Sequence, residues 1–373
     1  MKMKSTRKIA VTIGSVILMA VTASGCSFGY SIVGVRYENA DKYTAGETDI
    51  SADVKNLDLN WQVGTVNVST HSGKDIEVRE ESKKPISEDL KLRWWLDGDT
   101  LRVQYAKSGI QLELKPGEEK DLSVTLPEDI ELDELGVTGG NMEMDIPELQ
   151  VENLNMDFTS GDVNARTDAK KIGFNGTSGR IRVETGEDTE RIRGSLTSGN
   201  MDIEAGEADT VQVHGTSSDI FVKIDKAETL DTGSTSGKVT IESKDVRDLS
   251  VSTTSGGIQV TAEKVKNLNV GTNSGTEKLD ILEAGDVELD STSGDITAML
   301  GAFEKLKVDT NSGKVTALLP DKPGFTARLD TNSGKIGGSL PLSGEEPLFR
   351  CGDGSKSVEI DTTSGNIRIE SIK

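Results

Sequence analysis

Few side chains in this 373-residue chain could perform acid–base or metal chemistry. It contains two histidines, His71 and His214, and two cysteines, Cys26 and Cys351. No Ser-His-Asp set, Cys-His pair, metal-ligand spacing or phosphate-binding loop surrounds them. Carboxylates are abundant and could pair as in glycosidases, but no Trp or Tyr follows Tyr105 to form a platform for sugar rings. The sequence predicts no enzyme, cofactor or metal, and a polysaccharide-cleaving β-helix is the least favoured alternative.

The chain is strongly acidic, which limits the partners it can take. Its formal net charge is −21 at pH 7, and it becomes −25 without residues 1–25, which carry four positive charges and no acid. This field repels nucleic-acid phosphates and anionic lipid headgroups. The charge therefore argues against a nucleic-acid partner and agrees with an extracellular surface and with cationic or envelope ligands.

Residues 1–25 have the three parts of a secretory signal: a basic start, an apolar run from Ile9 to Ala23, and small residues before a cysteine. The segment Ala23-Ser24-Gly25-Cys26 resembles the lipobox of bacterial lipoproteins, in which the cysteine thiol is acylated and becomes the mature N-terminus. Cleavage after Val21-Thr22-Ala23 would instead release a soluble protein. The uncharged stretch from Ile9 to Val35 is also long enough to remain as a membrane-anchoring helix. All three alternatives export the body of the chain, and the lipobox predicts a lipid anchor on Cys26 at the outer side of the cell membrane.

A unit of about nineteen residues that turns on Ser-Gly recurs through most of the chain. Eleven copies align between Gly161 and Gly365, one of them with Ser218 in place of the glycine, at spacings of 18 to 21 residues except for a last interval of 31. Thr or Asn precedes the serine of each corner. One unit has too few apolar side chains to offset the entropy of ordering it, so the units must stack. The structural turn column includes Ser160, Gly161, Ser178, Gly179, Ser198, Gly199, Ser236, Gly237, Ser293, Gly294, Ser364 and Gly365.

Apolar and polar residues alternate on both sides of each corner at the period of β-strands. In one unit, Leu249 lies seven residues before Gly256 and Ile258 lies two residues after it. Each unit therefore predicts two short strands that meet at the Ser-Gly corner. The whole predicts an all-β fold, a parallel β-solenoid of about eleven coils and, at ~4.8 Å per coil, some 50 Å in length. Glu277 interrupts one apolar column, which predicts a local bulge at Thr276-Glu277.

The chemistry of the corners can be explained by structure alone. Glycine supplies the backbone freedom for a sharp turn, and Ser, Thr and Asn side chains can satisfy amides left unpaired there. In register, these side chains would form ladders of hydroxyl groups. The functional alternative is that the regular hydroxyl array is offered to a ligand or to ice.

The composition divides the chain into a signal peptide (1–25), a tether (26–49), a β-rich cap (50–134) and the solenoid (135–373). We expect the cap to cover the open edge of the stack. Asp97-Gly98-Asp99 predicts a hairpin turn, and Trp94 and Trp95 just before it are candidate binding residues, with packing of the cap as their favoured role. The long last interval predicts that residues 341–355 leave the stack as a loop. Cys351 within it is an unpaired thiol if Cys26 is acylated, and a Cys26–Cys351 disulfide is the alternative if it is not.

The chain resembles the bacterial DUF4097 family of β-strand repeat proteins, to which an adhesin label is attached. The resemblance covers roughly residues 50–373 and lies in Gly64-Thr65-Val66-Asn67-Val68, Leu122-Ser123-Val124-Thr125-Leu126-Pro127, the Thr-Ser-Gly repeats and the closing Thr363-Ser364-Gly365-Asn366-Ile367. It implies an extracytoplasmic, often membrane-tethered protein without assigned catalytic residues. We expect a non-enzymatic adhesion, binding or structural protein of the bacterial envelope. The alternative is an envelope-stress or regulatory module that acts through a protein partner.

Replacement of Cys26 by serine tests the lipid anchor. The lipid is carried on a thiol, so Cys26→Ser should abolish acyl labelling and move the protein from the membrane fraction to the soluble fraction. Both are measured by metabolic labelling and fractionation of cells that express either form. Acyl labelling that persists in the variant, together with membrane association, would contradict the lipobox assignment.

Overall fold

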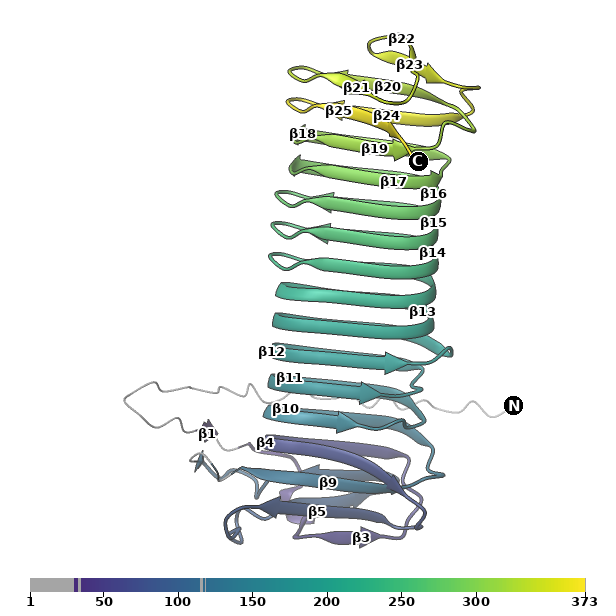
Figure 1. Cartoon of the computed structure of the whole chain (residues 1–373). Coiled ribbons are helices and arrows are strands. Elements are labelled where there is room, and N and C mark those ends of the chain that lie inside the picture. The colour runs from purple at the N-terminus through teal and green to yellow at the C-terminus, as the bar shows by residue number, and fades with distance from the viewer. Residues whose placement is uncertain (1–29, 33–34, 115–116, 118, 373) are drawn as a thin grey trace, which may run out of the picture.

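The computed structural model describes residues 30–32, 35–114, 117 and 119–372. Coils are stacked into a rod, with a β-rich cap at the N-terminal end (Figure 1). A short 3-10 helix (Ala40–Lys42) lies in the cap, and a search of the described residues finds no helix that could span a bilayer. Cys26 and the predicted signal peptide lie outside these residues.

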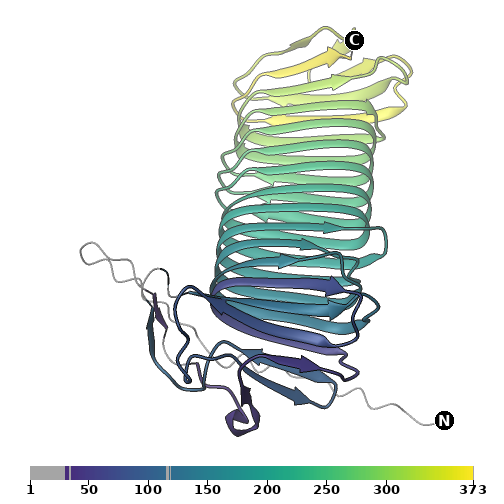
Figure 2. The same cartoon turned by 60° about the horizontal axis from the view of Figure 1, so that its bottom comes forward.

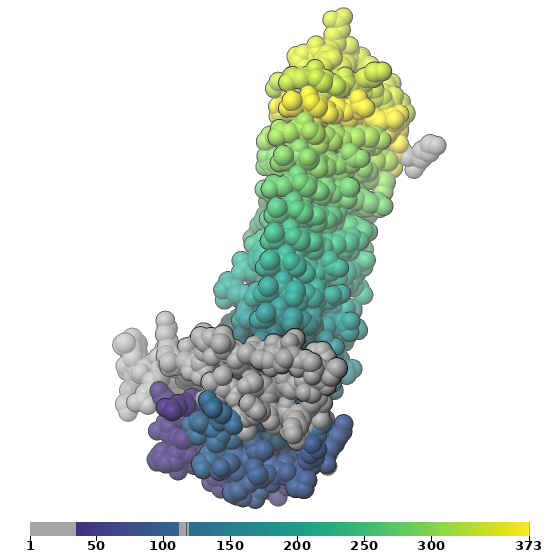
Figure 3. Space-filling model, turned by 90° about the vertical axis from the view of Figure 1, so that its left-hand side faces the viewer, coloured from purple at the N-terminus to yellow at the C-terminus, as the bar shows by residue number. Residues whose placement is uncertain are grey.

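Parallel pairing in register builds the rod. Leu154 pairs with Ile172, and Ile172 pairs with Ile192, so the apolar columns expected from the sequence lie one above the other. Figure 2 shows the two walls of the stack, and Figure 3 shows consecutive coils piled above the cap. This confirms the prediction of an all-β parallel solenoid. The strands of the stack are β4 (Asn56–His71), β10 (Leu132–Ile146), β11 (Val151–Arg166), β12 (Lys171–Thr185), β13 (Thr189–Ser234), β14 (Val239–Thr253), β15 (Ile258–Thr272), β16 (Glu277–Ser293), β17 (Ile296–Ala302), β18 (Lys305–Ser312), β19 (Val315–Leu319), β20 (Phe325–Thr331), β21 (Ile336–Gly338), β24 (Lys356–Thr362) and β25 (Ile367–Ser371).

The glycine at most corners is required by the neighbouring coil, and the corner that lacks it holds Ser218, whose buried hydroxyl donates to the carbonyl of Leu196 at 2.9 Å. A Cβ atom on Gly256 would lie 1.8 Å from the carbonyl oxygen of Gly237, and a Cβ atom on Gly275 would lie 1.8 Å from that of Gly256. Left-handed φ values, in contrast, occur at some corners, such as Gly161 and Gly179, and not at Gly256 or Gly275. Close approach of adjacent coils is therefore the general reason for glycine, and the backbone freedom expected from the sequence matters at a subset of corners.

Hydroxyl groups satisfy the corner from the inside of the rod. The amide of Gly237 donates to Ser234 Oγ at 3.0 Å, and the amide of Gly275 donates to Thr272 Oγ1 at 3.0 Å. The amide of the corner serine Ser255 instead donates to the carbonyl of Thr235 in the preceding coil at 2.9 Å. The groups that satisfy these glycine amides thus lie three residues before the glycine, not in the Thr/Asn-Ser pair that the sequence suggested. We call the hydroxyl groups at this position the inner hydroxyl column, and its buried members are Ser234, Thr253, Thr272, Ser291, Thr310 and Thr362. Ser234 and Thr272 accept from a glycine amide, whereas the hydroxyls of Ser291, Thr310 and Thr362 have no hydrogen-bond partner among the described residues.

Glu277 does not form the bulge expected from the sequence. It pairs in register with Ile258 on β15 and with Ile296 on β17. Its side chain is 1 % exposed, inside the apolar column. The prediction of a bulge is wrong because continuous backbone pairing on both sides holds Glu277 in the regular inward position.

The C-terminal coil is inserted out of sequence order. β24 pairs in parallel with β18 on one side and with β20 on the other, and β25 lies between β19 and β21 in the same way. Outward side chains that are neighbours on adjacent coils consequently alternate in charge along the rod, in the order Glu288, Lys307, Glu359 and Arg328. Stacking in sequence order would place Lys307 beside Arg328, so the insertion replaces a repulsive neighbour with an attractive one.

Both ends of the stack are covered. At the C-terminal end, the hairpin of β22 (Ser343–Glu345) and β23 (Leu348–Cys351) pairs antiparallel with β20. Residues 341–355 therefore do not simply leave the stack as a loop, and Cys351 is a buried free thiol on a strand. Burial raises the pKa of this thiol, and Asp321 adds to the effect.

The N-terminal cap covers the other end through β7 and β9, which pair in parallel with β4. β4 itself pairs in register with β10, so the parallel stack extends into the segment assigned to the cap from the sequence. β6 and β7 form the hairpin predicted at Asp97-Gly98-Asp99. The cap strands are β1 (Tyr30–Ile32), β2 (Thr44–Ala45), β3 (Thr48–Ile50), β5 (Ile76–Ser82), β6 (Arg93–Asp97), β7 (Thr100–Gln104), β8 (Leu112–Leu114) and β9 (Lys120–Pro127).

Two adjacent glycines, Gly256 and Gly257, distinguish the effect of close approach between coils from the general effect of replacing a glycine. We expect Gly256→Ala to destabilise the rod by about 3 kcal/mol or more, because its Cβ would overlap a backbone oxygen. Gly257→Ala is the control, since the nearest atom would be Thr276 Oγ1 at 3.5 Å, and it should change stability by less than ~1 kcal/mol. Chemical denaturation of both variants measures the difference. Equal losses would contradict the close-approach explanation.

Candidate functional site

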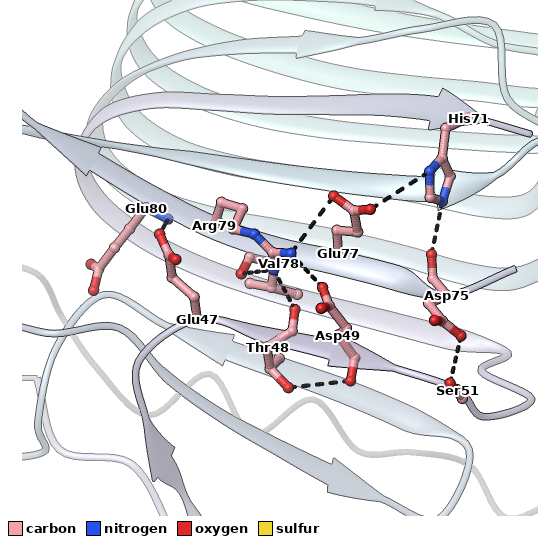
Figure 4. Close-up of polar contacts among 10 residues, drawn as sticks. All are labelled: Glu47, Thr48, Asp49, Ser51, His71, Asp75, Glu77, Val78, Arg79 and Glu80. Atoms are coloured by element: carbon pink, nitrogen blue, oxygen red, sulfur yellow. Dashed lines mark hydrogen bonds and ion pairs between the residues drawn. The ribbon is translucent and has the colours of Figure 1, made fainter. Parts of the chain in front are cut away.

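Charged side chains gather on the cap where β3 lies against β5 (Figure 4). Arg79 on β5 donates to the backbone carbonyl of Thr48 at 2.7 Å and forms an ion pair with Asp49 on β3. The carboxylate of Glu77 lies 3.8 Å from the same guanidinium group. These contacts join a short edge strand to the cap, which is a structural role.

His71 and Ser51 belong to the same network but do not form a nucleophilic site. Ser51 Oγ donates to the carboxylate of Asp75, and His71 Nε2 lies 2.8 Å from the backbone oxygen of Asp75. His71 Nδ1 lies 3.8 Å from the carboxylate of Glu77. In a catalytic triad the serine hydroxyl contacts the histidine ring, whereas here the serine contacts the aspartate. His214 is an exposed residue, and its Nε2 lies 3.5 Å from the carboxylate of Asp231.

A buried lysine joins three strands of the cap region. Lys120 Nζ donates to the carboxylate of Glu80 at 2.5 Å and to the backbone oxygens of Leu90 and Tyr105. It also lies 4.8 Å from the ring centre of Trp61 and 4.4 Å from that of Tyr105. Burial lowers the pKa of Lys120 to about 8, against the opposing effect of Glu80. A lowered lysine pKa can mark a reactive amine, but this side chain is only 3 % exposed, so we assign it to stability.

One concave surface is a groove along the rod, with a volume of about 660 Å³. It follows the wall of strands that precede the corners, from β14 to β24 and β20, and crosses the inserted coil. Two columns of outward side chains line it. The acidic column is, in spatial order, Asp290, Asp309, Asp361 and Asp330, and the amide and hydroxyl column contains Asn273, Thr292, Asn311, Thr363 and Asn332.

The carboxylates of the acidic column differ in their partners. Lys307 forms an ion pair with Asp309 at 3.0 Å, and Arg328 lies 3.4 Å from Asp330. Within the described part of the chain, Asp290 and Asp361 have no ion pair. Partial burial raises the pKa of both, and neighbouring carboxylates add to the effect, while Arg328 near Asp361 and Lys307 near Asp290 oppose it. The groove therefore contains two carboxylates that a cationic group would stabilise, beside amides and hydroxyls that can donate and accept hydrogen bonds.

The residues singled out from the sequence do not meet in this groove. Trp94 packs partly against the core, and the ring of Trp95 contacts that of Tyr43 at 5.6 Å. The corner serines Ser236 and Ser293 are exposed at the edge of the coils. The acidic column was not predicted from the sequence, although its signal is present there: in the last four units, aspartate lies four residues before the turn glycine.

The part of the chain that the structure describes contains no candidate metal centre. No group of three or more His, Cys, Asp or Glu side chains there is arranged around a common point that could hold a metal ion. The acidic column follows the strand spacing in a line, whereas a metal needs ligands that converge.

Comparison with known families identifies the family of the chain. The family model described as Toastrack DUF4097 matches residues 54–245 and 223–370. The chain belongs to this family. The match confirms the resemblance found in the sequence.

Two solved structures are similar to this DUF4097 chain. One is described as a "putative cell adhesion protein" from Clostridium sporogenes, is 11 % identical, and covers 89 % of this chain and 100 % of its own, with a TM-score of 0.23. The other is described as a "putative adhesin" from Bacteroides fragilis, is 12 % identical, and covers 88 % of this chain and 97 % of its own, with a TM-score of 0.22. A comparison with curated proteins gives no match.

The buried lysine leads to a stability prediction. Lys120→Met should leave Glu80 buried without its cation and cost roughly 3–5 kcal/mol of unfolding free energy. The double variant Lys120→Met/Glu80→Gln removes both charges and should recover part of that loss. Denaturant unfolding measures both. A single variant as stable as the parent would contradict the structural role.

Proposed function

We propose that this protein is an exported, membrane-tethered and non-enzymatic binding protein of the bacterial envelope, with an adhesion role. The observation that carries the proposal is the long groove, whose lining repeats from coil to coil. A surface of repeated columns suits an extended ligand better than a compact substrate. The signal-like residues 1–25 and the lipobox-like Cys26 support the tether.

The ligand we propose for the groove is an extended cationic polypeptide. Asp290 and Asp361 lie two coils apart in the parallel register, which corresponds to ~9.6 Å at the usual strand spacing. A polyproline II chain advances ~9.3 Å in one turn of three residues. A chain along the rod axis with a basic side chain at every third residue would thus bring its cations opposite these two carboxylates.

The amide and hydroxyl column supplies the remaining recognition. A polyproline II chain has no internal hydrogen bonds, so its backbone carbonyls are free to accept. Asn311 lies between Thr292 and Thr363 in this column. These side chains can donate to such carbonyls while the acidic column holds the cations.

Charge-neutral replacements in the groove test this function. The probe is a peptide of about twelve residues with lysine at every third position and proline elsewhere. We expect Asp290→Asn/Asp361→Asn to weaken its binding about tenfold or more, since two charge contacts are lost. Fluorescence anisotropy at low salt and at about 0.5 M salt measures the affinity, which should fall as screening rises.

The matched control removes two acids outside the groove. Glu143 and Glu152 are exposed on β10 and β11, so Glu143→Gln/Glu152→Gln changes the net charge equally. Less than about a twofold loss is expected for this control. Equal losses in the two double variants, or absence of binding by the parent protein, would reject the groove as the site. Turnover of a polysaccharide on a glycan panel would reject the non-enzymatic assignment.

A further inference from the structure

The interior of the rod contains one carboxylic acid that neither the fold nor the groove requires. Glu277 stands two residues after the corner glycine, where neighbouring coils have Ile258 and Ile296. Its side chain is 1 % exposed. Neither carboxyl oxygen has a hydrogen-bond partner among the described residues. A buried polar group in this state costs free energy, and a buried charge costs far more.

The surroundings of Glu277 offer no cation. β15 presents Ile258 and Val260 to the interior, and β17 presents Ile296 and Ala298. In the described part of the chain, the one charged group that acts on it is Asp290, on the following strand wall, which has the same sign. Burial and then Asp290 raise the pKa of Glu277 to about 8. The neutral carboxyl is therefore the form that fits the closed coil.

In a solenoid, ionisation of one buried side chain should destabilise only the coils near it. Each coil contacts only its two neighbours, so a weakened coil within the stack can open while the coils beyond it remain paired. Glu277 is flanked on both sides by regular coils, since β15 and β17 continue the apolar columns. It lies in the same coil as Thr272 and Asn273, which line the groove.

We propose that Glu277 makes the segment of residues 258–298 a pH-sensitive joint, closed while the carboxyl is protonated and opened when it ionises. The joint acts through the coil itself and does not depend on what the groove binds. An exported rod would then be stiff under acidic conditions and would yield at this segment under alkaline ones.

The direction of the pH dependence follows from proton linkage. Below the ordinary glutamate pKa of 4.5, Glu277 is protonated in both the closed and the open state, and the closed state has its full stability. Between 4.5 and about 8, opening releases a proton, so the opening constant rises up to tenfold per pH unit. Above about 8 the effect levels off. Lys120 acts in a different window, because its pKa, lowered from 10.5 to about 8, makes the fold more stable as pH rises through that range.

Hydrogen exchange of the full chain, followed by mass spectrometry of its peptides, tests the joint. Exchange is measured between about pH 5.5 and pH 8.5 and corrected for the intrinsic pH dependence of amide exchange. In the parent protein, the opening constant of residues 258–298 should rise on the order of a hundredfold. Peptides from β11 and β12 should not show this rise.

Three variants test whether the carboxyl of Glu277 causes the pH dependence. Glu277→Gln retains the shape without titrating, and Glu277→Ile restores the apolar column, so both should lose the pH dependence, with stronger protection in the isoleucine form. Glu283→Gln changes an exposed acid on the same strand and should behave as the parent does. Asp290 and Asp361 remain in all forms, so their own titration cancels in the comparison. A flat profile in the parent, a rise that persists in Glu277→Gln, or a rise spread evenly over all coils would overturn the proposal.

Discussion

The close approach of successive coils at the Ser-Gly corner is the constraint on which the rest of the structure depends. A Cβ atom at a position such as Gly256 would lie 1.8 Å from a carbonyl oxygen of the next coil. The small residue at this position therefore marks how each coil aligns with its neighbours. Once the corners are superposed, the period of two places one set of side chains inside and the other outside. The apolar columns, the inner hydroxyl column and the outward acidic column all follow from this register.

The ends of the rod show how a repeat structure avoids open edges. The cap strands β7 and β9 pair with β4, and the β22–β23 hairpin pairs with β20. Unpaired edges would recruit other chains. The inserted C-terminal coil adds a second device, because β24 is paired on both sides and the end of the chain is held inside the stack. The alternation of Glu288, Lys307, Glu359 and Arg328 favours this order over sequential stacking.

The same register produces both the groove proposed as a binding surface and the position of the proposed pH-sensitive joint. Outside, it aligns Asp290, Asp309, Asp361 and Asp330 into a line of carboxylates along a groove. Inside, it forces Glu277 into an apolar column, where no partner is available among the described residues. A fold whose backbone pairing is continuous has no local means of turning a single side chain outward. Both proposals for this family member therefore rest on residues that vary between units, on either side of a backbone that repeats.

The sequence by itself determined the fold class, the turn column and the inward and outward faces, because each of these depends on spacing within one unit. The spacing of Ser-Gly pairs and the alternation around them are local properties of the chain. Only the tertiary structure decided the spatial order of the last coils, the capping by residues 343–351 and the inward position of Glu277. Each of these depends on which strand lies beside which, and that choice is made by hydrogen bonds and charges between segments far apart in the chain. The groove belongs to this second group, since Asp361 joins Asp309 only when the C-terminal coil is inserted.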